Sequence, residues 1–96
     1  MSVYVDSERN RFGRMVMCHM FADTADELHA MAARIGMRRS WYQPFSFPHY
    51  DVCLTRRGKA IEHGALVVDR RQGYLIRKAI RVRILEDEPF AREWRA

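Results

Sequence analysis

Residues 14–36 read RMVMCHMFADTADELHAMAARIG, a stretch that carries both local signals from which the fold can be worked out. Its first eight residues, 14–21, are almost all apolar, which predicts a buried strand. Alternate side chains of a strand share a face, so His19 is expected on the same face as Phe21, with Cys18 on the opposite face. A histidine inside such a strand is a candidate for function.

A helix follows this strand. Thr24 with Glu27 three residues later is the capping-box pattern of a helix start, and Gly36 is typical of a helix end. Apolar residues between these ends recur at i, i+3, i+4 and i+7, so one stripe of the helix is expected to pack on the sheet. The stripe consists of Leu28, Met31, Ala32 and Ile35.

Shorter elements are expected on both sides of this unit. Runs of alternating or continuous apolar residues predict strands, and polar runs with glycine predict loops. The expected elements are a strand over 2–6, a loop over 7–13, a strand over 49–54, a helix from its N-cap Thr55 to Gly64, and a strand over 65–68.

Residues 75–84 carry two patterns at once. Leu75, Ile76, Ala79 and Ile80 have helical spacing, whereas 80–84 alternates apolar residues with arginines as an amphipathic strand would. We expect a helix that gives way to a strand. The order β-β-α-β-α-β, followed by this C-terminal helix and strand, predicts one small α/β domain over residues 1–96 with a mixed sheet.

The composition excludes several classes of protein. With 48% hydrophobic residues the 96-residue chain can form a core, and five Gly and three Pro are too few for a disordered or collagenous chain. No run approaches the roughly 20 apolar residues of a membrane helix, and the first residues lack the pattern of a secretory signal. We therefore expect a cytoplasmic protein with no membrane partner. Cys18 and Cys53 are expected as free thiols, with a disulfide between them as the alternative.

Positive charge is concentrated in the second half of the chain. The net charge is +5, but residues 56–83 alone carry +7, and residues 84–96 reverse to −2. Such a basic segment is typical of phosphate or nucleic-acid binding, because each neutralised phosphate releases counterions. The alternative is a solvated surface, since 15 of the 17 basic residues are arginines and genome composition alone can produce that bias.

Four polar residues fall on the expected strands, where such side chains are unusual unless they are used. Asp6 ends the first strand and His19 lies within the second, while His49 and Asp51 are two residues apart and so share a face of the third. A His-x-Asp pair can hold a divalent metal, or its carboxylate can fix the imidazole tautomer so that the ring acts as a base. The candidate catalytic residues and metal ligands are therefore His49, Asp51, His19 and Asp6.

An ordered series of short motifs runs through the first two thirds of the chain. The series is Tyr4-Val5-Asp6, Cys18-His19, Ala22-Asp23, Glu27-Leu28-His29, Ile35-Gly36, Trp41-x-Gln43, His49-Tyr50-Asp51, Ala60 and Gly64-Ala65. It resembles the small bacterial and phage family called domain of unknown function 4031. The resemblance implies a compact stand-alone domain and brings no established activity. It singles out Asp6, His19, Asp23, His29, Trp41, His49 and Asp51, with Arg57 as a basic partner.

Two arginines are candidates for phosphate binding. Arg56 and Arg57 fall in the first helical turn after Thr55, where unpaired N–H groups and the helix dipole favour an anion. A guanidinium also offers two parallel donors to phosphate oxygens. The alternative is that Arg57 pairs with Asp51 or Asp6 in a structural salt bridge.

Aromatic residues surround the proline-bracketed loop 44–48, which we expect to act as a lid. Phe45 and Phe47 in this loop, and Trp41 before it, can stack a nucleobase. Such residues are more often part of a core, and Trp41 is expected to be packed, so the two phenylalanines are the better candidates for ligand contact.

Three functions are consistent with these features. The first is a phosphate-directed enzyme, a nucleotide or nucleic-acid hydrolase in which a histidine acts as general base, the aspartates orient it or hold a metal, and Arg57 binds phosphate. The second is a non-catalytic nucleic-acid or nucleotide-binding protein that uses residues 56–83. The third is an interaction module that forms a homodimer through the exposed edge of the 80–84 strand. The first is favoured, because polar side chains on buried strands are costly and need a reason.

Overall fold

A computed structural model describes residues 2–87 of the protein, with side chains up to residue 83. Its centre is a five-stranded sheet built around β3 (Met15–Ala22), the longest strand. β1 (Val3–Val5) and β2 (Asn10–Phe12) pair antiparallel with the two ends of β3, on one of its edges. β4 (Tyr50–Cys53) pairs antiparallel along the other edge, and β5 (Leu66–Val67) joins β1 in parallel. The predicted α/β class with a mixed sheet is confirmed.

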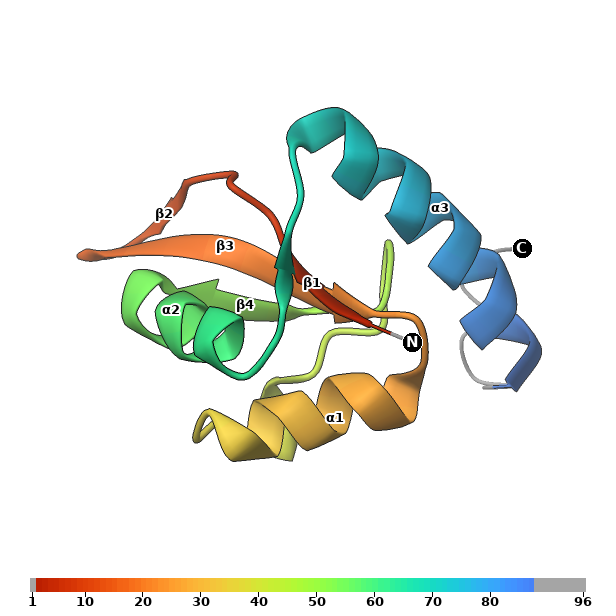
Figure 1. Cartoon of the computed structure of the whole chain (residues 1–96), viewed down its shortest axis with the longest axis horizontal. Helices are drawn as coiled ribbons and strands as arrows, with labels where there is room; N and C mark the ends of the chain where they lie inside the picture. The colour runs from red at the N-terminus through yellow and green to blue at the C-terminus, as the bar shows by residue number, and fades with distance from the viewer. Residues whose placement is uncertain (1, 88–96) are drawn as a thin grey trace.

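Helices cover both faces of this sheet, as Figure 1 shows: α1 (Ala25–Arg34) and α2 (Leu54–Glu62) lie on one face and α3 (Arg70–Asp87) lies on the other. A short 3-10 helix, η1 (Arg39–Trp41), follows α1. The faces divide the side chains of β3 as the alternation predicts. Cys18 and Met20 are fully buried toward α1 and α2, whereas Phe21 packs toward α3.

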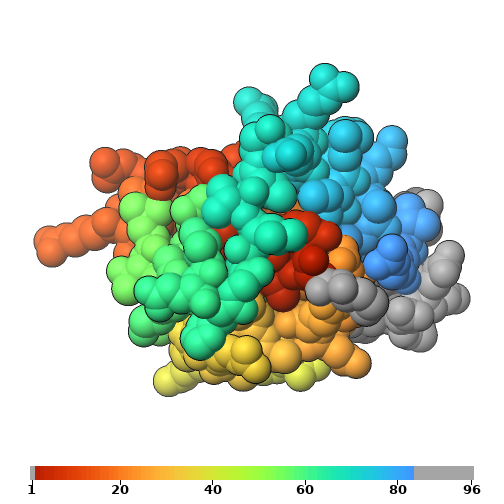
Figure 2. Space-filling view, viewed as in Figure 1, coloured from red at the N-terminus to blue at the C-terminus, as the bar shows by residue number. Residues whose placement is uncertain are grey.

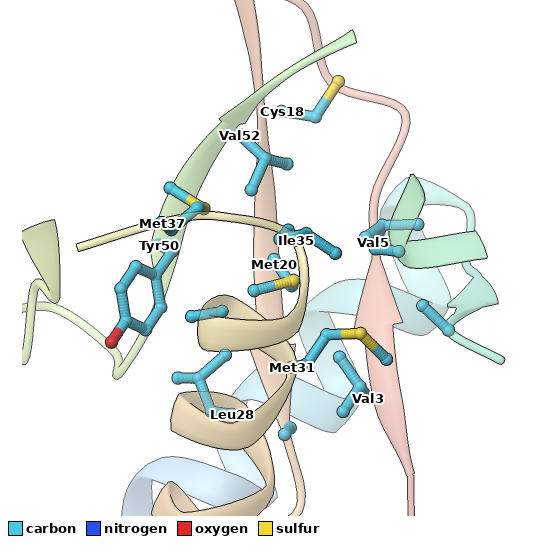
Figure 3. Packing of buried hydrophobic residues seen from close by; sticks show 14 residues of the cluster. Val3, Val5, Cys18, Met20, Leu28, Met31, Ile35, Met37, Tyr50 and Val52 are labelled. Atoms are coloured by element: carbon cyan, nitrogen blue, oxygen red, sulfur yellow. The ribbon is translucent and has the colours of Figure 1, made fainter. Parts of the chain in front are cut away.

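The larger core lies between the sheet and α1. All four residues of the predicted helical stripe are buried there, and Figure 3 shows Leu28, Met31 and Ile35 pointing at strand residues such as Val3 and Tyr50. The helix begins as predicted, because the Thr24 hydroxyl oxygen accepts the backbone N–H of Glu27 at 3.2 Å and the same hydroxyl donates to the Glu27 carboxylate.

Glycine ends both α1 and α2 by the same device. Gly36 (φ 81°) and Gly64 (φ 100°) adopt the left-handed backbone that glycine accepts without steric cost. The residue after Gly36 donates its N–H to Ala32 O at 2.8 Å, and the residue after Gly64 donates to Ala60 O at 2.9 Å. These bonds are those of a Schellman motif, and they satisfy carbonyls that the helix leaves open.

Three expectations from the sequence are wrong in detail. The polar run 7–13 is not only a loop, because it contains the strand β2. All three residues of β2 are exposed and pair with β3 through backbone hydrogen bonds, so the strand leaves no hydrophobic pattern in the sequence. Thr55 is not the N-cap of the second helix, since Cys53 leaves β4 and occupies that position itself.

The strand expected over 80–84 does not exist either, because α3 continues through these residues. Ile76 and Ile80 lie one helical turn apart and both pack against the Phe21 cluster, so the helical spacing decides the structure. Residues 80–84 therefore offer no strand edge through which two copies of the chain could pair. Homodimerisation stays a prediction, but it would need another surface.

Two smaller expectations can also be compared with the structure. Cys18 and Cys53 are free thiols, as expected, and the β3–β4 register places them on opposite faces of the sheet. None of the helices within residues 2–87 is long and apolar enough to cross a membrane. The basic segment 56–83 covers most of α2, β5 and most of α3.

Candidate functional site

The candidate site lies on the sheet face that carries α3, just beyond the part that this helix covers. Apolar residues around Phe21 and Ile80 fill the space under α3. The next pair along β3 toward β2 is polar, because His19 stands opposite Asp51 of β4. On the other edge of β3, the backbone N–H of Asp6 donates to His19 O at 3.0 Å, so Asp6 lies beside the same histidine.

The ring of His19 is held by a buried carboxylate. Its Nδ1–H donates to Asp6 Oδ2 at 2.7 Å, and its backbone N–H donates to Asp6 Oδ1 at 2.9 Å. Asp6 is only 2% exposed, and burial alone would raise its pKa, but these two hydrogen bonds from His19 hold the pKa below its usual value. The hydrogen bond to Asp6 in turn raises the pKa of His19 against the opposing effect of burial.

The ring of His49 is fixed in the same way by a backbone carbonyl. Its Nδ1–H donates to Phe47 O at 2.7 Å, which leaves Nε2 as the acceptor nitrogen of the neutral ring. His49 is buried, and this burial lowers its pKa, with nearby cations His19 and Arg77 adding to the effect. His49 is therefore neutral near pH 7.

Both free Nε2 atoms face one carboxylate oxygen. His49 Nε2 lies 3.4 Å from Asp51 Oδ1, and His19 Nε2 lies 3.9 Å from the same oxygen. The other oxygen, Asp51 Oδ2, accepts the side-chain N–H of Gln43 at 2.9 Å, which fixes the orientation of the carboxylate. The ligand atoms of His19, His49 and Asp51 all lie within 4.8 Å of one another.

The loop 44–48 closes the cluster on one side. The Phe47 ring stacks on His49 at 4.3 Å between centroids and meets His19 edge-on at 5.5 Å. A tight turn positions it, because Phe47 N–H donates to Phe45 O and the residue between them, Ser46, has a φ of 66°. The loop 44–48 thus lies over the histidines, which is the position expected of a lid. That the loop opens and closes stays a prediction.

Arg77 of α3 brings positive charge to this side of the site. Its guanidinium carbon lies 4.6 Å from the centre of the Phe47 ring, and its NH1 lies 3.6 Å from Glu8 Oε2. Glu8 Oε2 is itself 3.3 Å from His19 Nδ1. Glu8, Gln43 and Arg77 were not predicted as site residues. Two of them left usable signals in the sequence: Glu8 lies two residues after Asp6, and Gln43 belongs to the Trp41-x-Gln43 motif.

The structure therefore brings together four of the residues expected from the sequence, Asp6, His19, His49 and Asp51, and adds Phe47 to them. Arg57 does not bond either carboxylate. Its Nε–H donates to the backbone carbonyl of Asp6 at 2.8 Å and its NH2 group donates to the Ser7 hydroxyl at 3.3 Å, so it supports the end of β1. Its role toward phosphate stays a prediction.

The other expected ligand-binding residues lie outside the cluster. Arg56 and Trp41 lie together, with the guanidinium carbon 5.5 Å from the indole ring, and Phe45 is 60% exposed at the tip of its loop. Trp41 is 42% exposed, so the expectation that it is packed is wrong: η1 places it at the surface rather than in the core.

Two further family-pattern residues have structural partners. The Asp23 carboxylate accepts the backbone N–H of Ser2 at 2.7 Å and the Tyr4 hydroxyl at 3.0 Å. His29 Nδ1 is 2.7 Å from the Tyr50 hydroxyl oxygen on the α1 side of the sheet, away from the cluster. The Asp23 contact connects the start of α1 to β1, and the His29 contact connects α1 to β4.

Fold and site together define a small α/β protein with two histidines and an aspartate converging on one partly open sheet face. The model of a family described as "Protein of unknown function (DUF4031)" matches residues 3–80, and the chain belongs to this family. The match spans every residue of the cluster and extends through most of α3, beyond the motifs in the first two thirds of the sequence. No curated protein and no solved structure gives a significant match.

Proposed function

We propose that this protein is a divalent-metal-dependent hydrolase of phosphate esters, with a nucleotide or nucleic acid as substrate. The observation that carries the proposal is the convergence of His19 Nε2, His49 Nε2 and Asp51 Oδ1, with the remaining nitrogen of each histidine already bonded to an oxygen.

A metal ion explains this convergence better than packing does. In the neutral His49 tautomer that Phe47 imposes, the Nε2 lone pair faces Asp51 Oδ1 at 3.4 Å and the two acceptors repel. A divalent ion that displaces the Nε2 proton of His19 meets a second imidazole nitrogen there. A cation between the three atoms turns this repulsion into three bonds. The oxygen partners of the two Nδ1–H groups match the arrangement that orients metal-bound histidines in general.

Two histidines and one carboxylate leave room for water. Catalytic zinc sites use three protein ligands and keep a fourth position open, and the same ligand set with open positions holds iron(II). A zinc ion held by these ligands would lower the pKa of its water to about 7, so that hydroxide would be available without a side-chain base. In this arrangement the histidines act as ligands, and the sequence-based role of His49 or His19 as general base applies only to a metal-free site.

The charge around the site favours a phosphate substrate. Arg77 lies over Phe47, next to the histidines, and a guanidinium there stabilises the negative charge of a phosphoryl group. In the proposed reaction a water molecule gives up a proton to solvent as its oxygen adds to phosphorus, the bond from phosphorus to the ester oxygen breaks, and the leaving oxygen takes a proton from solvent. A metal ion held by His19, His49 and Asp51 would activate that water.

Chromogenic esters test the proposal directly. Protein treated with chelator should not hydrolyse bis(4-nitrophenyl) phosphate or 4-nitrophenyl phosphate, and Zn²⁺ or Mn²⁺ should restore hydrolysis of at least one of them. His49→Ala and Asp51→Asn should abolish the restored activity. His63→Ala is the matched control, because His63 lies exposed at the end of α2 and should leave activity unchanged. Hydrolysis that no metal restores, or that survives both substitutions, would overturn the proposal.

A second candidate, nucleic-acid binding without catalysis, rests on a basic cavity of about 350 Å³ beside α3. Arg77, Lys78 and Arg81 line it together with Tyr74 and Phe47. Binding through such a surface falls steeply with salt, because phosphate contacts release counterions. Affinity for a single-stranded oligonucleotide that drops steeply between low and high salt, and that Asp51→Asn leaves unchanged, would favour this function over hydrolysis.

A further inference from the structure

A cavity adjoins the cluster of His19, His49 and Asp51 at the end of β3 that pairs with β2. It has a volume of about 600 Å³, within the range of small-molecule sites, and Asp51 forms part of its wall. Gln43, the partner of Asp51 Oδ2, lines it as well. A ligand in this cavity would therefore reach the Asp51 carboxylate directly.

Apolar and aromatic side chains form most of the cavity. Met15 and Met17 of β3 and Phe12 of β2 provide one side, and Trp41 of η1 provides another. Phe12 is 71% exposed and Trp41 is 42% exposed, so flat hydrocarbon surface faces solvent at this point. The β2–β3 hairpin that carries the first side projects from the body of the molecule in Figure 2.

Positive charge surrounds the tryptophan. The guanidinium carbons of Arg38 and Arg56 lie 6.0 Å and 5.5 Å from the Trp41 ring centre, close enough for cation–π attraction. Arg56 also donates to Gly36 O at 3.4 Å, so its side chain is anchored beside the cavity that it lines. This combination attracts a ligand that is both planar and anionic.

We infer that this cavity binds the nucleobase of a nucleotide unit whose phosphate lies at His19, His49 and Asp51, an inference that rests on the proposed function and specifies its substrate. A base stacks on Trp41, methionine side chains contact its edges, and the Ser40 hydroxyl and Gln43 amide supply polar contacts for its ring nitrogens and exocyclic groups. An aliphatic ester would use the apolar walls but neither the arginines nor the polar groups.

A comparison of two small phosphates isolates the base. Adenosine 5′-monophosphate and ribose 5-phosphate share sugar and phosphate, and only the first carries a base. Isothermal titration with and without Zn²⁺ should show tighter binding of adenosine 5′-monophosphate. Trp41→Ala should weaken that binding by roughly 5- to 150-fold, as loss of a stacking partner does, and should leave ribose 5-phosphate unaffected. Trp41→Phe should retain most of the affinity.

Control variants and outcomes separate the two proposals. Leu75→Ala removes an exposed apolar side chain of α3 that lines neither this cavity nor the basic one, and it should not change the affinity for adenosine 5′-monophosphate. Equal affinities for the two phosphates, or a Trp41→Ala variant that matches the wild type, would overturn the base-binding inference even if metal-dependent hydrolysis is found. Base-dependent binding without any metal-dependent hydrolysis would retain the cavity assignment and overturn the hydrolase.

Discussion

Replacing Asp6 by asparagine should reverse the tautomer of His19. Asp6 Oδ1 accepts the backbone N–H groups of His19 and Glu8 at 2.9 Å and 3.3 Å, while Oδ2 accepts the ring Nδ1–H at 2.7 Å. An asparagine whose oxygen stays on the two backbone groups turns its NH₂ group toward Nδ1. The ring must then accept at Nδ1 and carry its proton on Nε2, the atom that faces Asp51.

The expected consequence is a large loss of metal affinity. Removing the hydrogen-bond partner of a metal-bound histidine generally costs 10- to 100-fold, and here the ligand lone pair is lost as well, so we expect about 100-fold, or about 2.8 kcal/mol. Isothermal titration of chelator-treated protein with Zn²⁺ at neutral pH measures it.

Glu8→Gln is the matched control for this substitution. Glu8 Oε2 lies 3.3 Å from His19 Nδ1, so this variant also removes a nearby negative charge, but Asp6 continues to hold the tautomer. Its Zn²⁺ affinity should stay within about threefold of the wild type. An Asp6→Asn affinity equally close to the wild type would refute the argument that the His19 tautomer controls the site.

Three further perturbations test the fold that holds the site. Leu28→Ala removes a fully buried side chain and should lower the free energy of unfolding in urea by about 2–5 kcal/mol, whereas a loss below about 1 kcal/mol would contradict the packing of α1. Gly36 has a φ of 81°, so Gly36→Ala should lower the free energy of unfolding by about 1–2 kcal/mol. Gly58 lies inside α2 with open space around its Cα, so Gly58→Ala should raise the free energy of unfolding by about 0.5–1 kcal/mol. Effects of the same sign for the two variants would contradict the assigned backbone. Burial lowers the pKa of His29 below 6.5, so its neutral form favours folding; this contribution is complete above pH 6.5 and is lost as the pH falls through the lowered pKa. His29→Asn keeps a hydrogen-bonding group near the Tyr50 hydroxyl and should make unfolding curves less sensitive to acidification below pH 6.5, and an unchanged sensitivity would contradict the lowered pKa.

Local patterns were sufficient to predict the half of the fold that contains β3, α1 and β4. The alternation in β3, the Thr24 cap and the stripe ending at Ile35 are all set by neighbours within a few residues. α3 was harder, because its inner face includes glycine and arginine beside Ile76 and Ile80, which weakens the helical stripe. A Cβ at Gly73 would lie 3.5 Å from Val68 and 3.7 Å from Phe21, which are ordinary van der Waals distances, so this glycine leaves a gap in the helical stripe although the space does not require it.

The candidate site was predictable to the extent that it depends on strand geometry. His49 and Asp51 share a face because they are two residues apart, and their meeting with His19 follows from the β3–β4 register, which no local pattern specifies. Arg77 could not be identified beforehand, because its place beside Phe47 depends on how α3 packs across the sheet. Trp41 was expected in the core for its size, whereas the turn of η1 leaves it at the surface.

The most direct test of the account is an anomalous diffraction measurement on crystals grown from chelator-treated protein and soaked with Zn²⁺. One strong peak is expected, bonded to His19 Nε2, His49 Nε2 and Asp51 Oδ1 at the roughly 2.0–2.2 Å typical of zinc bound to nitrogen and oxygen ligands. Crystals that show no peak between these three atoms, or a peak only elsewhere on the molecule, would contradict it.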